Sequence, residues 1–252
     1  ENLFYNPALQ SYMDSSYSEA IPKFELYLTK FPSGRFTNET YYFLGNSLYK
    51  TKDTLNAVKY FEQFLETPNN VYSELAASRT AGFYYSKQNY VAALKYYEKL
   101  DQLASKPSGV LNAKMGLMRC VFLTENYSKA SIYAKIVLGT SGISTQQKIE
   151  GEYANAISNY NLKNYEEAKE SLEWLVKNTT TAMGSESKYT IADIYFKKAQ
   201  YEQADIEIKS LLKMKPSYNY WVAKGLILQS RIMIINNDLF QAEQTLKSVL
   251  DY

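Results

Sequence analysis

Asn164-Tyr165-Glu166-Glu167-Ala168, followed by Leu172 and Leu175, is the stretch of sequence that decides the fold. Taken alone it predicts the start of a helix, because Asn164 is placed to accept hydrogen bonds from free backbone amides and Glu167 to complete a capping box. Its alanine then recurs along the whole chain. Equivalent alanines, at successive spacings of 36 to 38 residues, are Ala20, Ala57, Ala93, Ala130, Ala168, Ala204 and Ala242. We name this set the alanine ladder.

Mostly apolar and aromatic side chains accompany each ladder alanine at constant distances. Three residues before it stand Tyr17, Thr54, Tyr90, Tyr127, Tyr165, Tyr201 and Leu239. Four residues after it stand Phe24, Phe61, Tyr97, Ala134, Leu172, Ile208 and Leu246. Seven residues after it stand Tyr27, Phe64, Leu100, Val137, Leu175, Leu211 and Val249. Because these offsets share one face of an α-helix, each alanine marks an amphipathic helix of a repeated unit.

Each ladder alanine belongs to the second helix of a predicted two-helix hairpin. The clearest hairpin runs from residues 41–50 through a turn at 51–53 to Ala57. Small residues mark the equivalent position of the first helices, namely Ala8, Gly45, Ala81, Ala156, Ala192 and Ser230, with Met118 as the exception. We expect the two helices to cross most closely there, since a larger side chain would push the hairpin open.

The sequence therefore predicts an all-α fold, a right-handed superhelical solenoid of about seven helix-turn-helix repeats. We expect a single domain over 1–252, a fragment of a longer chain because its first residue is Glu1 rather than methionine. Ser144 and Gln147 predict a capping box, and segments 138–144 and 178–187 are expected to be the longest loops. The repeats are predicted at about 5–32, 37–68, 71–106, 109–140, 145–178, 185–216 and 218–251.

Charge and hydropathy exclude two classes of partner. The formal net charge is +2, from 28 Lys and Arg against 26 Asp and Glu. This balance does not suit a protein whose affinity depends on neutralising phosphates, so we expect neither nucleic acid nor an anionic membrane as partner. No apolar run approaches the ~20 residues needed to cross a bilayer.

The residue types needed for catalysis are scarce. The chain has no histidine and a single cysteine, Cys120, which cannot form a disulfide within the chain. Cys120 lies in an apolar helical pattern, where we expect a small buried side chain that no histidine activates. The acidic pairs at 150–152 and 166–167 are interpreted as solvated helix faces. We therefore expect no enzymatic activity, no metal site and no cofactor.

Two columns of side chains on the first helices are the candidate binding site, because first helices line the concave face of such a solenoid. Eight residues before the ladder alanines, the −8 column contains Tyr12, Tyr49, Tyr85, Phe122, Tyr160, Phe196 and Ile234. Fifteen residues before them, the −15 column contains Tyr5, Tyr42, Ser78, Met115, Tyr153, Tyr189 and Ile227. The columns are either a groove for a partner segment or packing between adjacent repeats.

Polar residues near the −8 column are placed to set the register of a ligand. The complete set of candidate partner-binding residues is Tyr42, Asn46, Tyr49, Tyr85, Met115, Arg119, Phe122, Tyr153, Tyr160, Tyr189, Asp193 and Phe196. Asn155 and Asn159 occupy first-helix positions that are apolar or Tyr in other repeats. Their amides are either satisfied by neighbours inside the protein or turned toward a ligand.

The last repeat carries apolar residues on every side of its predicted first helix. This pattern indicates burial on more than one side. We expect contact with a second copy, with further chain or with a partner through Leu226, Ile227, Ile234 and Ile235.

The chain resembles tetratricopeptide repeat proteins over its full length, through the alanine ladder and the Leu44-Gly45 pattern of the second repeat. Residues 17–33 and 39–45 are similar to repeats of bacterial envelope proteins. Those proteins include the periplasmic coordinator of the Tol–Pal system and the outer-membrane assembly lipoprotein of the Bam complex. Residues 221–228 and 238–242 are similar to the closing repeat of long tetratricopeptide proteins from Bacteroidetes. The resemblance implies a scaffold in the bacterial periplasm or at the outer membrane.

One activity of the family is excluded. Relatives that bind chaperone tails hold a terminal carboxylate with Lys and Asn on one first helix and with Lys and Arg on a later one. In this chain Tyr42 and Leu75 occupy places that should be basic, although Asn46 and Arg79 fit the set.

The sequence thus favours a non-catalytic protein–protein interaction scaffold that binds a protein or peptide segment on its concave face. Two alternatives stay open. One is a Tyr-rich receptor for a glycan or a short signalling peptide, and the other is a passive spacer in a larger exported protein.

Overall fold

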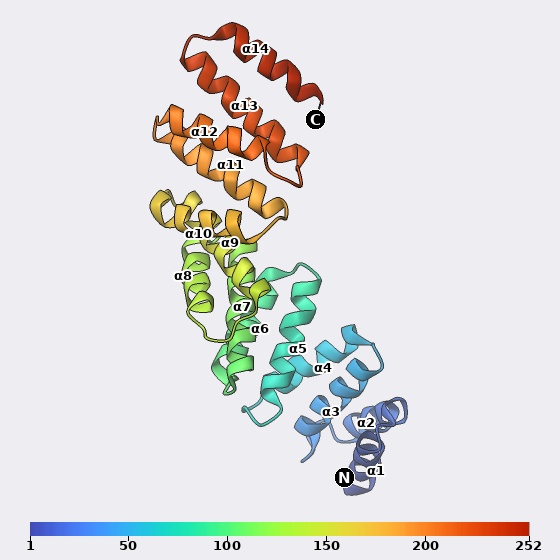
Figure 1. Cartoon of the computed structure of the whole chain (residues 1–252). Helices are drawn as coiled ribbons and strands as arrows, with labels where there is room; N and C mark the ends of the chain where they lie inside the picture. Colours follow the sequence, from blue (N-terminus) through green and yellow to red (C-terminus); the bar gives the residue numbers. More distant parts are fainter. Residues whose placement is uncertain (252) are drawn as a thin grey trace. The chain divides into compact units, whose positions relative to one another are not determined.

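The computed structural model describes residues 1–251, in which fourteen α-helices and one short 3-10 helix follow one another without a strand (Figure 1). The all-α prediction is confirmed. The helices are α1 Asn2–Met13, α2 Tyr17–Lys30, α3 Thr37–Lys50, α4 Thr54–Leu65, α5 Ser73–Ser86, α6 Tyr90–Leu103, α7 Pro107–Leu123, α8 Tyr127–Leu138, α9 Thr145–Asn161, α10 Tyr165–Asn178, α11 Ala182–Lys197, α12 Tyr201–Leu212, α13 Asn219–Ile235, α14 Leu239–Ser248 and η1 Val249–Asp251.

The chain divides into two units, Glu1–Thr124 and Glu125–Tyr252. In unit 1, which contains α1 to α7, each helix packs against the next one along the chain. In unit 2, which contains α8 to α14, the same order of contacts holds. First helices of successive hairpins also touch, as α1 does with α3 and α11 with α13. This sequential packing is the arrangement predicted for helical repeats, whereas one continuous domain over 1–252 stays a prediction.

The alanine ladder marks the most closely packed points of the second helices. Its seven members are 0 to 2% exposed. Gly45, on the facing first helix α3, shows why small residues are needed. A β-carbon added to Gly45 would lie 3.0 Å from the ring of Phe61 and 3.1 Å from the carbonyl oxygen of Ala57. The predicted close crossing of the two helices is therefore confirmed in this hairpin.

A left-handed residue ends every first helix, a feature that sequence reasoning missed. Five residues before each ladder alanine the backbone has φ between 56° and 70°, at Ser15, Lys52, Gln88, Glu125, Lys163, Ala199 and Asn237. In six of the seven turns the next residue donates its amide proton to a carbonyl five positions earlier, as Asp53 does to Leu48 at 2.9 Å. This bond satisfies a free carbonyl at the helix end. None of the seven is glycine, the usual residue for this conformation, so nothing in the sequence marked the turn.

Helix caps confirm one prediction and correct another. The Ser144 hydroxyl accepts from the amide of Gln147 at 3.2 Å, and the Gln147 side chain accepts from the Ser144 amide at 2.8 Å. Asn164 precedes α10 as predicted, but its side chain makes no cap hydrogen bond. It donates instead to Oδ1 of Asn159 at 3.2 Å, so the capping box predicted at Asn164 is wrong. A buried amide acceptor competes successfully for the side chain that would have capped the helix.

The capping box gives the first testable prediction. Replacing Ser144 with alanine is expected to lower the free energy of unfolding by about 1 kcal/mol, because an amide at the start of α9 loses its acceptor. Chemical denaturation followed by circular dichroism measures the change. Ser128→Ala makes the same substitution at an exposed residue of α8 and should shift stability by less than about 0.5 kcal/mol. Equal effects of the two substitutions would contradict the assignment.

Two helix starts differ from the prediction. Helix α1 begins at Asn2 and contains Pro7 within it, rather than starting at about residue 5. Helix α11 begins at Ala182, so the loop expected over 178–187 spans only residues 179–181. Gly184 and Ser185 are weak helix formers, but both are buried at the start of α11. Tertiary packing therefore overrides their intrinsic preference. Among the described residues, the longest connection is 66–72.

Candidate functional site

The two columns of unit 1 differ in exposure. In the −8 column, Tyr12, Tyr85 and Phe122 are partly exposed and Tyr49 is 38% exposed. In the −15 column, Tyr42 and Met115 are only 4% and 3% exposed. Tyr42 stacks on Tyr72 with ring centroids 4.2 Å apart, so its ring belongs to the core. In unit 1 the open aromatic surface is thus the −8 column, whereas Tyr42 and Met115 of the −15 column belong to the core.

A chain of polar contacts joins the first three hairpins of unit 1. The Asn46 amide donates to the hydroxyl of Tyr12, and Arg79 donates to Oδ1 of Asn46. The guanidinium of Arg79 also lies over the ring of Tyr49, with its Cζ atom 4.3 Å from the ring centroid. Asn46 is 5% exposed, so its amide mainly fixes the relation of neighbouring repeats. Arg119, the other polar candidate of this unit, lies partly exposed on α7.

A groove opens beside Tyr49. Its volume is about 400 Å³, and it is lined by Tyr49, Thr54, Ser78, Arg79, Gly82, Phe83 and Ser86. Small residues recur every four positions on α5, at Ser78, Gly82 and Ser86, and all three line the groove. Arg79 is the charged residue of this lining, and sequence reasoning had considered it only for the excluded terminal-carboxylate activity.

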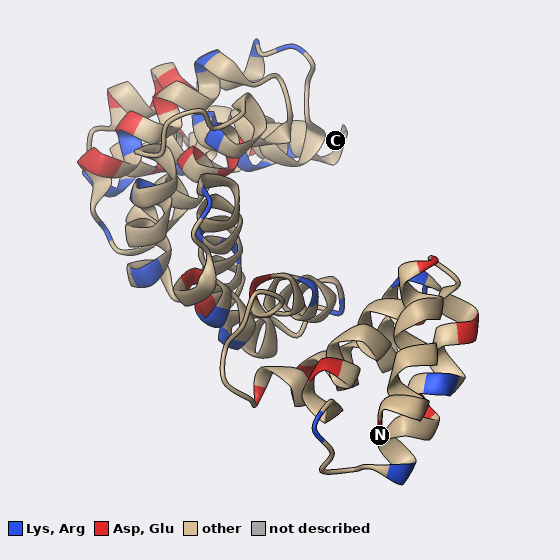
Figure 2. Cartoon of the chain, turned by 90° about the horizontal axis from the view of Figure 1, so that it is seen from below, with Lys and Arg blue, Asp and Glu red and all other residues tan. Residues whose placement is uncertain are grey.

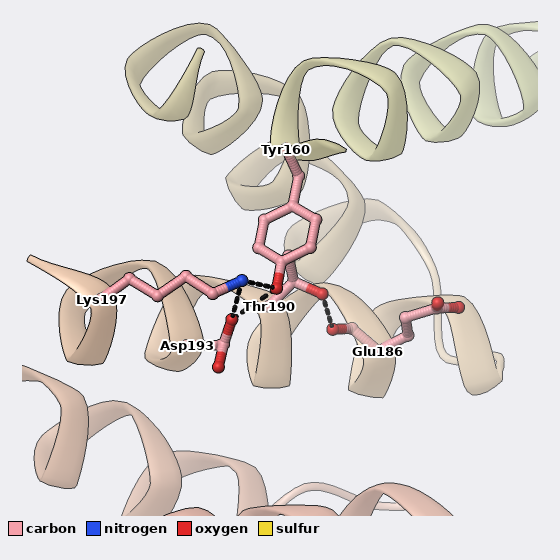
Figure 3. Close-up of polar contacts among 5 residues, drawn as sticks. All are labelled: Tyr160, Glu186, Thr190, Asp193 and Lys197. Atoms are coloured by element: carbon pink, nitrogen blue, oxygen red, sulfur yellow. Dashed lines mark hydrogen bonds and ion pairs between the residues drawn. The ribbon is translucent and has the colours of Figure 1, made fainter. Parts of the chain in front are cut away.

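In unit 2 the candidate residues form a polar and aromatic cluster between α9 and α11. Figure 3 shows Tyr160 reaching from α9 toward Asp193 and Lys197 on α11. The Tyr160 hydroxyl donates to Asp193, whose Oδ2 is 2.9 Å from Nζ of Lys197. The Lys197 ammonium also lies 4.3 Å from the centroid of the Tyr160 ring. Two turns earlier on both helices, Tyr153 donates to Oε2 of Glu186 at 3.0 Å.

The remaining aromatic candidates of unit 2 are half-buried. Phe196 packs against Tyr201 with ring centroids 5.5 Å apart. Tyr189 lies 5.6 Å from Trp221, and the Lys224 ammonium is 4.8 Å from the Tyr189 ring. Here the −15 column stays partly exposed, unlike its counterpart in unit 1. Sequence reasoning did not single out Glu186, Lys197 or Lys224, because charged residues at helical spacing usually belong to a solvated face.

Burial and pairing keep Tyr160 neutral and Lys197 charged, because together they raise the pKa of both groups. Burial, with the hydrogen bond to Asp193, raises the pKa of Tyr160 to about 12. Burial alone would lower the pKa of Lys197, but its contacts with Tyr160 and Asp193 raise it above the ordinary value. At neutral pH the face therefore presents neutral phenols and a charged ammonium, which suits binding rather than proton transfer.

Asn155 and Asn159 are satisfied inside the protein. They are 7% and 2% exposed. Nδ2 of Asn159 lies 2.9 Å from Oδ1 of Asn155 and 3.1 Å from Oγ of Ser131, and Nδ2 of Asn155 donates to Ser171 at 3.0 Å. Of the two interpretations, internal pairing holds, and it links α8, α9 and α10.

The apolar face of the last repeat is only partly open. Leu226 is 9% exposed and packs inward, so it offers no surface to a partner and that expectation is wrong for this residue. Ile227, Ile234 and Ile235 are 37%, 49% and 49% exposed. Contact of these three with another chain stays a prediction.

The remaining features considered for a site are the cysteine, metal-binding clusters, membrane spans and the distribution of charge. Cys120 is buried, and burial raises the pKa of its thiol to about 11. Within residues 1–251, no group of three or more acidic, His or Cys side chains is placed to hold a metal ion. Over the same residues, no helix combines the length and apolar character of a membrane span. In each unit Lys and Arg are interspersed with Asp and Glu (Figure 2).

Comparison with known proteins identifies two segments. Residues 1–74 match the YfiO family, described as outer membrane lipoprotein, and residues 185–218 match the tetratricopeptide repeat family. A crystal structure of a tetratricopeptide repeat protein from Parabacteroides merdae ATCC 43184 is similar at TM-score 0.48 and 15% identity, over 99% of this chain and 92% of that one. No curated protein matches the sequence significantly.

Residues 185–218 thus contain a tetratricopeptide repeat, and the two-helix pattern of that repeat recurs through the described residues. More particularly, its first 74 residues carry the similarity to outer membrane lipoproteins. The resemblance to the lipoprotein of outer-membrane assembly, inferred from residues 17–33 and 39–45, is confirmed over this segment.

Proposed function

We propose that this chain is a non-catalytic protein–protein interaction scaffold of the bacterial cell envelope. It binds an extended or helical segment of a partner on the first-helix face of its repeats. The observation that carries the proposal is the contrast in exposure between the alanine ladder and the −8 column of the same repeats. The alanine ladder is closed completely, whereas the −8 column keeps aromatic rings at the surface, with Tyr49 38% exposed.

Rings in this setting suit recognition of a peptide. Tyrosine offers a large apolar face at low conformational cost and a hydroxyl for hydrogen bonds at the rim. Tyr and Arg are also the residue types that most often dominate binding energy at protein interfaces. Tyr49 and Arg79 supply this combination in unit 1, and Tyr160 with Asp193 supplies a related one in unit 2.

The chemistry of the surface supports binding rather than catalysis. The chain has no histidine, and burial raises the pKa of its thiol and of Tyr42 and Tyr160 on the first helices. None of these shifts activates a group near neutral pH. The match of residues 1–74 to outer membrane lipoproteins supports a place in the periplasm or at the outer membrane.

Selection of short random peptides displayed on phage tests the proposal. We expect enriched peptides to bind the wild-type chain and to lose about tenfold or more in affinity on Tyr49→Ala or Tyr85→Ala, because truncated interface tyrosines remove apolar contact area. Leu55→Ala and Val91→Ala are matched controls, since these residues of second helices in the same unit are 58% and 75% exposed. Fluorescence anisotropy measures affinity, and circular dichroism verifies the fold. Peptides that respond only to the control substitutions would refute the first-helix face.

A receptor for glycans is the second candidate, favoured by one feature of unit 2. Tyr220 is 65% exposed and meets Trp221 edge-on at 4.9 Å, which leaves an aromatic surface on which a sugar ring can stack. A glycan microarray distinguishes the two functions. Saturable sugar binding that is lost in Tyr220→Ala would favour the receptor. The absence of both peptide and glycan binding would favour a passive spacer.

A further inference from the structure

A hydrogen bond that joins neighbouring repeats at two places is missing beside Tyr49. At these two places the hydroxyl of a tyrosine in the −8 column bonds to the residue that stands eleven positions before the next ladder alanine. Tyr12 accepts from Asn46 in this way, and Tyr160 donates to Asp193. For Tyr49 the equivalent partner is Gly82, which has no side chain. Tyr49 makes no hydrogen bond through its hydroxyl among the described residues, so the contact is vacant.

The cluster at Tyr160 indicates which group is absent. There an aromatic ring, a cation and a carboxylate meet, with the Lys197 ammonium 4.3 Å above the ring and 2.9 Å from the carboxylate of Asp193. At Tyr49 the ring and the cation are both present, since Cζ of Arg79 lies 4.3 Å from the ring centroid. Arg79 makes no ion pair with a carboxylate within residues 1–251. The carboxylate is therefore the component that this site lacks.

Nothing inside the protein requires glycine at position 82. A β-carbon built there meets no atom within 4 Å. By contrast, one at Gly116 would lie 2.2 Å from the ring of Tyr97. Glycine weakens the interior of a helix, so at Gly82 the chain loses local stability without any gain in packing. What glycine does provide is open space, because Gly82 lines the 400 Å³ groove together with Tyr49 and Arg79.

We propose that this groove receives the side chain of an aspartate or glutamate from an internal position of the partner segment. The carboxylate lies over Gly82, accepts from the guanidinium of Arg79 and from the hydroxyl of Tyr49, and restores the set of groups found at Tyr160. Hydrogen bonds in which the donor or the acceptor is ionised are strong and directional. The inference rests on the proposed function and adds the chemistry of the bound residue.

The source of the carboxylate is a side chain rather than a chain terminus. In relatives that bind chaperone tails, Lys and Asn on one first helix and Lys and Arg on a later one hold a terminal carboxylate. Here Tyr42 and Leu75 occupy the places of two of these cations. Tyr42 is also 4% exposed and unavailable to a ligand. A single guanidinium beside an aromatic ring matches one acidic side chain.

The peptides enriched on the wild-type chain provide the test. We expect them to share an acidic residue, whose replacement by the corresponding amide weakens binding about tenfold or more, because it removes the charge from the hydrogen bonds to Arg79. Gly82→Asp places a carboxylate in the groove and should cause a similar loss, as should Arg79→Gln. Ser128→Asp adds the same charge at an exposed site of α8 and should leave affinity unchanged. Amidation of the peptide terminus should also have no effect.

The outcomes separate this inference from the proposed function. If acid-to-amide peptides and Gly82→Asp bind normally while Tyr49→Ala still abolishes binding, the scaffold stands and the acidic recognition is wrong. Loss of binding on amidation of the terminus would show a terminal carboxylate and overturn the inference as well. If the wild-type chain enriches no peptide at all, the proposed function itself fails.

Discussion

Replacing Phe61 with alanine is expected to lower the free energy of unfolding by about 3–5 kcal/mol, the usual cost of removing a fully buried aromatic ring. Phe61 is 0% exposed and fills the closest crossing of its hairpin. Its ring is the atom group that a β-carbon at Gly45 would meet at 3.0 Å. The Cζ atom of Arg79, from the next repeat, lies 5.9 Å from the ring centroid. The cavity would therefore disturb both the hairpin and its contact with the following one.

Urea denaturation followed by circular dichroism measures this effect. Leu55→Ala is the matched control, because Leu55 belongs to the same helix α4 and is 58% exposed. We expect its effect to stay within about 0.5 kcal/mol. A loss below about 1 kcal/mol for Phe61→Ala would mean that this ring does not fill the crossing as described.

Overpacking the alanine ladder should have the second largest effect. Ala168→Leu adds three carbon atoms at a residue that is 0% exposed and surrounded by Ala156, Leu172, Leu175, Ile191 and Ile194. The surrounding helices must move apart, at a cost of about 1–3 kcal/mol. Ala93→Leu makes the same change in unit 1, where Ala93 is also 0% exposed. Thermal melting and urea titration report the loss in each variant.

The control for these substitutions is Glu170→Leu, which introduces leucine at an exposed residue of α10. It should alter stability by less than about 0.5 kcal/mol. Wild-type melting temperatures for both ladder variants would show that the alanines do not mark the tight crossings. The repeat register, and with it the position of the −8 column, would then have to be reassigned.

Sequence reasoning located the −8 column correctly on the first helices but did not decide its use. Tyr42 and Tyr49 are seven residues apart and lie on similar faces of α3, yet they are 4% and 38% exposed. The difference arises because Tyr72, from the connection that follows α4, covers the ring of Tyr42. No pattern within one helix indicates which loop will cover which ring.

The sequence by itself determined the helices, their pairing and the small residues at their crossings. These features depend on side chains a few positions apart, and the 3.6-residue period of the helix places such side chains on one face. The capping box at Ser144 was predictable for the same reason, because all its atoms come from one turn.

Only the tertiary structure decided which polar side chains meet, both within a repeat and between repeats. Asn164 turns from its expected cap to Asn159, Arg79 reaches Asn46 and the ring of Tyr49, and Tyr160 meets Asp193. The Arg79–Asn46 and Tyr160–Asp193 pairs join residues 33 positions apart, so they depend on how one hairpin packs on the next. The open space beside Gly82 also depends on how neighbouring helices pack. The sequence of a helix does not show whether a neighbouring ring or open space lies beside a glycine. Only the packing of neighbouring helices distinguishes these two cases.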